Sequence, residues 1–141
     1  MGLFSNISNL LTAGANKVAG NTDYLEATSA FCALVAAADG NIEDSEFDAT
    51  VNTIKNNKTI GKAFSEDKIT TIVEKHLNQA KTRPGRLELR RELGDLKDFA
   101  VKEMVLMTAL EVADQGGISD VEMKVLKEGA GILGLDVNKY L

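Results

Sequence analysis

The chain has 141 residues, of which 44% are hydrophobic and 26% charged, a balance typical of a globular protein rather than a disordered one. Its formal net charge of -5 argues against nucleic-acid binding, because that function normally requires a basic domain or face. No stretch reaches the roughly twenty apolar residues that a membrane span requires, and the N-terminus lacks a signal-peptide pattern. The single cysteine, Cys32, lies in an apolar run, so we expect core packing in a reducing, cytoplasmic environment.

Residues 2–18, within an N-terminal segment of residues 1–20, are predicted to form a short amphipathic helix. The helical spacing is carried by Leu3, Phe4, Ile7, Leu10 and Leu11. The helix can either dock on the core or lie on a membrane surface, and its polar face carries only Lys17 where membrane-binding helices usually carry several basic residues.

From Thr22 to Ala38 the apolar residues keep one helical register, which predicts a helix with a buried face. A turn follows, and Phe47, Val51 and Ile54 mark the next helix. We expect a loop around Gly61, followed by a helix capped by Ser65.

The second half of the chain continues with helices. "TRPGR" at 82–86 is typical of a helix breaker, and "LELRREL" predicts a short helix that ends near Gly94. Residues 96–113 form the most apolar segment, so we expect this helix to be central. A last helix over 120–133 should stop at Gly134, with Asp136 capping a final turn. The chain is therefore predicted to be a single all-α domain, a bundle of about seven helices over residues 1–141.

Charge is unevenly distributed along the chain. Residues 18–54 contain seven acidic residues and no Lys or Arg, whereas residues 81–91 contain five basic residues and one acid, Glu88. The basic residues are Lys81, Arg83, Arg86, Arg90 and Arg91. This asymmetry favours protein contacts or self-association, although a solvated helix surface explains the basic cluster equally well.

Two segments, "AAADGNIEDSE" at 36–46 and "EVADQGGISDVE" at 111–122, share one design. Each ends an apolar helix at an aspartate, passes through a glycine-containing turn to an isoleucine, and places a glutamate near the start of a new helix. The equivalent residues are Asp39 and Asp114, Ile42 and Ile118, and Glu46 and Glu122. The similarity predicts two pseudo-symmetric helix-turn-helix halves.

Most acids in these segments are explained by helix-start chemistry. Ser119 and Glu122 form a capping-box pattern, and the first copy has Glu43 at the cap and Glu46 three positions later. Gly40, and Gly116 or Gly117, should supply the left-handed backbone of each turn.

Asp39 and Asp114 are different, because each lies at the C-terminal end of a helix, where the macrodipole disfavours a negative charge. Two explanations remain open. The carboxylate can accept hydrogen bonds from amides of the following turn. Alternatively, a divalent cation lies between Asp39 and Glu46, or between Asp114 and Glu122, in a site that does not fit the EF-hand pattern.

The chain resembles the TerB family of tellurite resistance proteins, small all-helical cytosolic proteins of bacteria and some phages. The resemblance rests on "MGLFSNI", the two turn segments and the ending "GILGLDVNKY". It implies two helical halves with neighbouring acidic turns and a divalent-cation site, for calcium or magnesium. By this resemblance the candidate metal ligands are Asp39, Glu46, Asp114 and Glu122.

The resemblance also implies a non-enzymatic stress-response protein that works with other proteins of a tellurite-resistance complex, including a membrane component and calcium-binding proteins. We therefore expect an interaction module in the cytoplasm or at the inner membrane. Two alternatives are a metal-dependent hydrolase that uses the paired carboxylates, and an adaptor attached to the membrane through residues 2–18. Against the hydrolase, the sole histidine, His76, is expected on a helix surface far from both turns.

Overall fold

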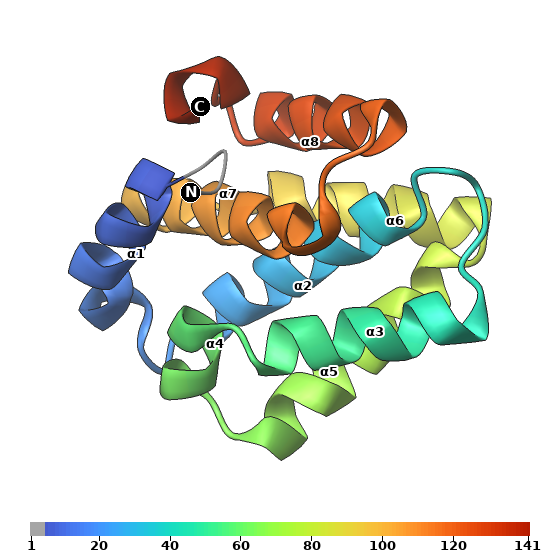
Figure 1. Cartoon of the computed structure of the whole chain (residues 1–141), viewed down its shortest axis with the longest axis horizontal. Helices are drawn as coiled ribbons and strands as arrows, with labels where there is room; N and C mark the ends of the chain where they lie inside the picture. Colours follow the sequence, from blue (N-terminus) through green and yellow to red (C-terminus); the bar gives the residue numbers. More distant parts are fainter. Residues whose placement is uncertain (1–4) are drawn as a thin grey trace.

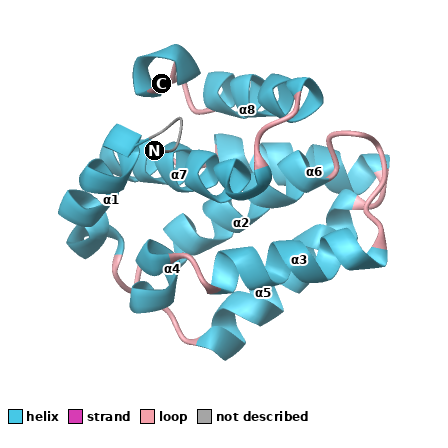
Figure 2. Cartoon of the chain, in the orientation of Figure 1, coloured by secondary structure: helices cyan, strands magenta, loops and turns pink. Residues whose placement is uncertain are grey.

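The computed structural model describes residues 5–141 and contains eight α-helices, two short 3₁₀ helices and no strand in that part of the chain (Figure 1, Figure 2). The elements are α1 (Ser5–Val18), α2 (Thr22–Ala36), α3 (Asp44–Lys55), α4 (Lys58–Ala63), α5 (Glu66–Ala80), α6 (Arg83–Gly94), α7 (Phe99–Ala113), η1 (Asp114–Gly116), α8 (Asp120–Ile132) and η2 (Val137–Tyr140). The all-α prediction is confirmed, with one helix more than the expected seven or so. Residues 2–4 of the predicted N-terminal helix lie outside the described residues.

Helix α2 is the centre of the fold. Figure 1 shows it crossing the middle of the molecule, and it contacts α3, α5, α6, α7 and α8. Eleven of its fifteen residues are buried, against eight of fifteen in α7, which packs alongside it. The predicted 96–113 helix, α7, is likewise part of the core. Both helices are core, but α2 carries the contacts between the two sides of the molecule.

Helix α1 packs its apolar face on the rest of the protein. Ile7, Leu11 and Val18 are buried, and the helix contacts α4 and α7, while Leu10 is 51% exposed. These contacts support the docking alternative for this segment. None of the helices in residues 5–141 combines the length and the apolar character needed to cross a bilayer.

Helix α4 occupies a segment for which a loop was expected. Asn57 caps it, since its Oδ1 accepts hydrogen bonds from the backbone N–H groups of Thr59 and Ile60, both at 3.1 Å. Ile60 is fully buried, and this burial stabilises a helix too short to persist alone. Gly61 lies inside the helix, so the glycine did not mark a loop here.

Helix α6 begins four residues earlier than expected, within the "TRPGR" breaker. Thr82 caps the helix by accepting the Gly85 N–H through Oγ1 at 3.1 Å. Pro84 lies in the first turn, where a missing N–H costs nothing because that group has no partner within the helix. A side chain at Gly85 would meet the Gln79 carbonyl oxygen at 1.7 Å, so close packing requires glycine at this position.

Helix α8 approaches α2 through a glycine. A Cβ added at Gly129 would lie 2.4 Å from the ring of Phe31, a residue with no exposed surface. The helix ends as predicted at Gly134, whose φ is +77°, with Leu135 N–H donating to the Ala130 carbonyl at 2.8 Å. Asp136 then caps η2 by accepting the Asn138 N–H.

Candidate functional site

The two predicted turns share their backbone geometry. Gly40 has a φ of +88° and Gly117 a φ of +83°, so each turn uses the left-handed region that glycine occupies without strain. Ile42 is buried, and Ile118 packs on the core from a half-buried position. The extra residue of the second turn is absorbed by η1, a single 3₁₀ turn. The likeness of the two turns is local, and the pseudo-symmetry of whole halves stays a prediction.

Both glutamates of the paired turns hold the start of a helix. Ser119 N–H donates to Glu122 Oε1 at 2.9 Å, and Glu122 N–H donates to Ser119 Oγ at 3.2 Å, which completes the predicted capping box. In the first copy, Glu43 N–H donates to Glu46 Oε1 at 3.3 Å. In each glutamate the Oε1 atom therefore accepts the capping hydrogen bond, and the Oε2 atom is not used by that bond.

The two aspartates differ from one another. Asp39 is exposed, and its Oδ1 accepts the Asn41 N–H at 3.1 Å, as an Asx-type turn does. This bond compensates the unfavourable helix-end position without a metal. Asp114 is half-buried at the start of η1.

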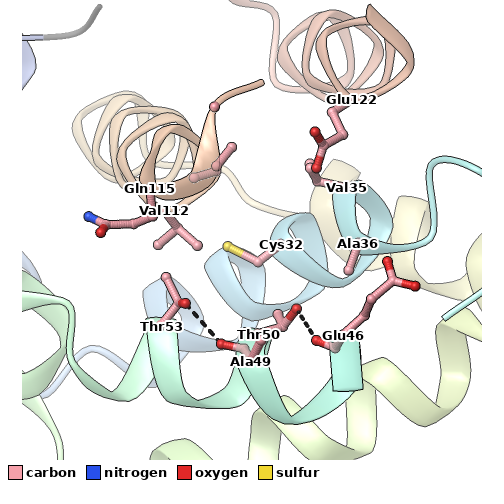
Figure 3. Close-up of a pocket in the computed structure, with 13 residues that line it drawn as sticks. Cys32, Val35, Ala36, Glu46, Ala49, Thr50, Thr53, Val112, Gln115 and Glu122 are labelled. Atoms are coloured by element: carbon pink, nitrogen blue, oxygen red, sulfur yellow. Dashed lines mark hydrogen bonds between the residues drawn. The ribbon is translucent and has the colours of Figure 1, made fainter. Parts of the chain in front are cut away.

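Glu46 and Glu122 line one hollow of about 520 Å³ between α2, α3, α7 and the start of α8 (Figure 3). Figure 3 shows the two glutamates at one end of this hollow, with Thr53 and Gln115 at the other end. Asp39 and Asp114 are not among the residues that line it. The structure thus brings two of the four predicted ligands to a common space.

The lining of this hollow is otherwise apolar or neutral. Its remaining residues are Cys32, Val35, Ala36, Ala49, Thr50, Ala109, Val112, Ala113 and Gly117. The Thr50 and Thr53 hydroxyls donate to carbonyls of their own helix at 2.8 Å. Cys32 is 4% exposed, as expected for core packing, and burial raises the pKa of its thiol to about 12. No Lys or Arg is among the described residues that line the hollow, so its charge is negative.

A metal ion would find few ligands in this arrangement. Among the residues that the structure describes, no three or more His, Cys, Asp and Glu side chains form a group that could hold a metal ion. Glu46 and Glu122 would supply two carboxylate oxygens, and turn carbonyls or waters would have to complete the coordination of a hard cation. The four-residue ligand set stays a prediction.

The basic cluster of residues 81–91 is largely engaged within the chain. Lys81 Nζ lies 5.0 Å from the centre of the Phe47 ring, and Arg86 Nη1 donates to the Ala80 carbonyl at 2.9 Å. Arg90 lies 3.9 Å from Glu128, and Arg91 lies 3.2 Å from Glu88. These contacts support the interpretation of the cluster as a solvated helix surface with local partners.

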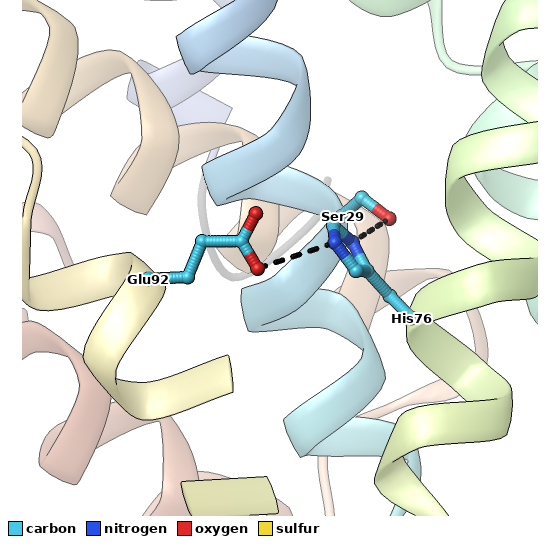
Figure 4. Close-up of polar contacts among 3 residues, drawn as sticks. All are labelled: Ser29, His76 and Glu92. Atoms are coloured by element: carbon cyan, nitrogen blue, oxygen red, sulfur yellow. Dashed lines mark hydrogen bonds and ion pairs between the residues drawn. The ribbon is translucent and has the colours of Figure 1, made fainter. Parts of the chain in front are cut away.

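His76 lies in the core, and the expectation of a surface position was wrong. Its side chain is 1% exposed, and Nδ1 shares a 2.8 Å hydrogen bond with Ser29 Oγ of α2 (Figure 4). On the other side of the ring, Nε2 lies 3.3 Å from Glu92 Oε2 of α6. The histidine thus connects three helices through polar contacts, and these contacts compensate its burial.

The Ser29, His76 and Glu92 contacts are not a hydrolytic site. Ser29 is 1% exposed, so a substrate carbonyl cannot reach its hydroxyl. A sequence signal for the buried position did exist, because His76 follows Ile69 by seven residues and Val73 by three, on the buried stripe of α5.

Glu92 also lines a second hollow, of about 410 Å³, near the starts of α2 and α7. The other residues there are Asn21, Asp23, Glu26, Ala27, Asp95, Leu96, Lys97, Asp98 and Val101. Acidic side chains predominate in this lining, but Lys97 contributes a positive charge, which the hollow between the paired turns does not have.

Comparison with known proteins identifies the family. The family model described as "Tellurite resistance protein TerB" matches residues 25–140, a range that includes both acidic turns and excludes α1. No curated protein and no solved structure gives a significant match. The match covers most of the chain, and the chain therefore belongs to the TerB family of tellurite resistance proteins.

Proposed function

We propose that this TerB protein is a non-enzymatic binding module of a tellurite-resistance or related stress response, and that it recognises cationic groups at the hollow between its paired turns. The observation that carries the proposal is that Glu46 and Glu122, from two separate helix starts, line one hollow with no Lys or Arg among its described lining residues. In this proposal the partners are other proteins of the stress complex, including membrane-associated proteins that the chain binds on the cytoplasmic side of the membrane.

A divalent cation is the first proposed ligand. Calcium and magnesium prefer oxygen donors, and Glu46 Oε2 and Glu122 Oε2 are not used by the capping bonds. Asp39 and Asp114 complete the proposed ligand set, because each carboxylate offers a further oxygen donor at the paired turns. With so few convergent carboxylates the affinity should be weak, on the order of 10⁻⁴ to 10⁻³ M, as in calcium sites of low ligand charge.

Backbone amide shifts during calcium and magnesium titrations test the cation part. Shifts at both 39–46 and 114–122 support one shared site, whereas shifts at a single turn break the shared-site model. Glu46→Gln should weaken the response because it removes the charge and keeps an acceptor oxygen for the cap. Asp67→Asn, in the exposed first turn of α5, is the matched control and should leave the response unchanged. A flat titration together with a pull-down from the host that recovers no partner would overturn the proposal.

A further inference from the structure

The hollow between the paired turns continues along α3. A neighbouring hollow of about 200 Å³ is lined by Asn52, Thr53, Asn56, Asn57, Val112 and Gln115. Three of these residues, Thr53, Val112 and Gln115, also line the first hollow. The two hollows are therefore neighbours along α3, beside the end of α7, and we call them together the α3 groove.

The groove is long enough for a short stretch of extended chain. Its α3 wall runs from Glu46 to the C-cap residue Asn56, ten residues apart, which corresponds to roughly 15 Å at the 1.5 Å rise of a helix. An extended peptide rises about 3.3 Å per residue, so about five residues fit along this wall. A compact small molecule would occupy only one part of it.

The chemistry of the groove changes along its length. One end carries the carboxylates of Glu46 and Glu122, and the middle is lined by small apolar residues such as Ala49 and Ala109. The far end carries amides, and the side chains of Asn52, Asn56 and Gln115 are exposed there. An amide side chain both donates and accepts, so it can pair with the N–H and C=O groups of a peptide backbone.

We propose that the α3 groove binds an extended segment of a partner protein, with a Lys or Arg at the Glu46 and Glu122 end and small apolar side chains in the middle. The inference rests on the binding-module part of the proposed function. Charge complementarity favours a basic residue, because Glu46 and Glu122 are negatively charged and neither hollow has a Lys or Arg among its described lining residues.

A second copy of the same chain is a poorer occupant than another protein. The basic cluster of residues 81–91 is the natural self-complement, but Lys81, Arg86, Arg90 and Arg91 already contact groups of their own chain. The cluster also lies on α6 and the residues just before it, in helical or turn conformation rather than extended.

Peptide binding to the full chain tests the inference. The peptides are eight residues long, immobilised in an array, and each carries one Lys or Arg next to small apolar residues. The control set has the same sequences with Glu in place of the Lys or Arg. We expect binding to the basic set only. The tightest peptide is then measured in solution by fluorescence anisotropy, and its position is mapped by the side-chain amide resonances of Asn52, Asn56 and Gln115.

Two variants separate the contributions of charge and shape. The Glu46→Gln and Glu122→Gln double variant keeps the capping acceptors and should weaken binding roughly tenfold, the sum of two rim ion pairs. Asp44→Asn with Asp120→Asn, which removes one exposed charge from each of the same helix starts, is its control and should bind normally. Ala49→Trp fills the groove from an exposed position and should reduce binding at least tenfold, whereas Ala13→Trp on the exposed face of α1 should not.

Several results would overturn the inference. These are equal binding of the Glu peptides, full affinity in Ala49→Trp, and peptide-induced shifts confined to the hollow around Glu92. Repeating the measurements with calcium and with a chelator separates this inference from the proposed cation site. Calcium shifts without peptide binding refute the peptide inference alone, and peptide binding with a flat calcium titration refutes the cation part alone.

Discussion

Two glycines of α8 should respond in opposite directions to replacement by alanine. Gly131 is exposed, its φ lies outside the left-handed region, and a Cβ added there would meet nothing within 4 Å. Alanine has the higher helix propensity, so Gly131→Ala should stabilise the protein by about 0.5–1 kcal/mol.

Gly129→Ala should destabilise the protein instead. The new Cβ would lie 2.4 Å from Phe31 Cζ and 2.5 Å from Phe31 Cε1, and carbon atoms pack at about 3.5–4.0 Å. The Phe31 ring is fully buried and has no free space to move into, so α8 must move away from α2 by about 1 Å or the ring must leave its rotamer. Overpacking of this kind costs about 1–3 kcal/mol, which exceeds the propensity gain. We expect the two variants to differ by about 2 kcal/mol.

Urea unfolding followed by circular dichroism at 222 nm measures both variants against the parent chain. The slope with denaturant should stay constant, so the midpoints report stability directly. In thermal unfolding the same difference corresponds to about 3 °C per kcal/mol for a chain of this size. If Gly129→Ala is as stable as Gly131→Ala, then α8 does not approach α2 as described, and the hollow lined by Glu122 loses its structural basis.

Three further predictions concern single side chains. His76→Leu leaves the buried Ser29 hydroxyl without its partner and should lower the free energy of unfolding in urea by about 1–3 kcal/mol. Adding Ser29→Ala should recover part of this loss, and no recovery would contradict the described contact. Ser119→Ala removes the α8 cap and should lower the free energy of unfolding by about 1 kcal/mol. Ser45, exposed in the first turn of α3, is the control, and Ser45→Ala should leave the stability nearly unchanged. Equal losses in the two variants would contradict the capping role. Burial raises the pKa of the Cys32 thiol from 9 to about 12, so the native thiol should resist Ellman's reagent at pH 8, and rapid labelling of the native protein would refute this. The thiol's contribution to stability should be lost as the pH rises from 9 to 12, because the thiol of the unfolded chain ionises first.

Features determined by neighbouring residues were predictable from the sequence. The Ser119 and Glu122 capping box, the Ser65 cap and the Asp136 cap each depend on a side chain and a backbone N–H two or three residues away. Gly134 ends α8 for an equally local reason, because it adopts the left-handed backbone without strain. Helix starts and stops of this kind require no knowledge of the rest of the chain.

Features determined by distant residues were not predictable in the same way. Helix α4 depends on the burial of Ile60, and the early start of α6 depends on the close approach of Gly85 to Gln79. His76 is buried because Ser29 and Glu92, 47 residues before it and 16 after it, supply polar contacts. A polar residue on an apolar stripe can be placed only when such partners are known.

The candidate site was predicted in part. Glu46 and Glu122 come from separate helix starts, and they do line a common hollow. The sequence pattern treated Asp39 and Asp114 as their equals, but Asp39 is turned to the Asn41 N–H, and neither aspartate lines that hollow. Side-chain direction within a turn depends on backbone dihedral angles that the pattern of residue types does not specify.

The capping bonds of Glu46 and Glu122 link helix order to the binding of any ligand that competes for their Oε1 atoms. A cationic ligand that draws either carboxylate away from its backbone N–H would loosen the first turn of α3 or α8. Thermodynamic linkage makes this effect reciprocal, so any contact that tightens those turns lowers the affinity by the same factor. A partner that only touches the outer surface of α3 or α8 could therefore release the ligand without entering the hollow.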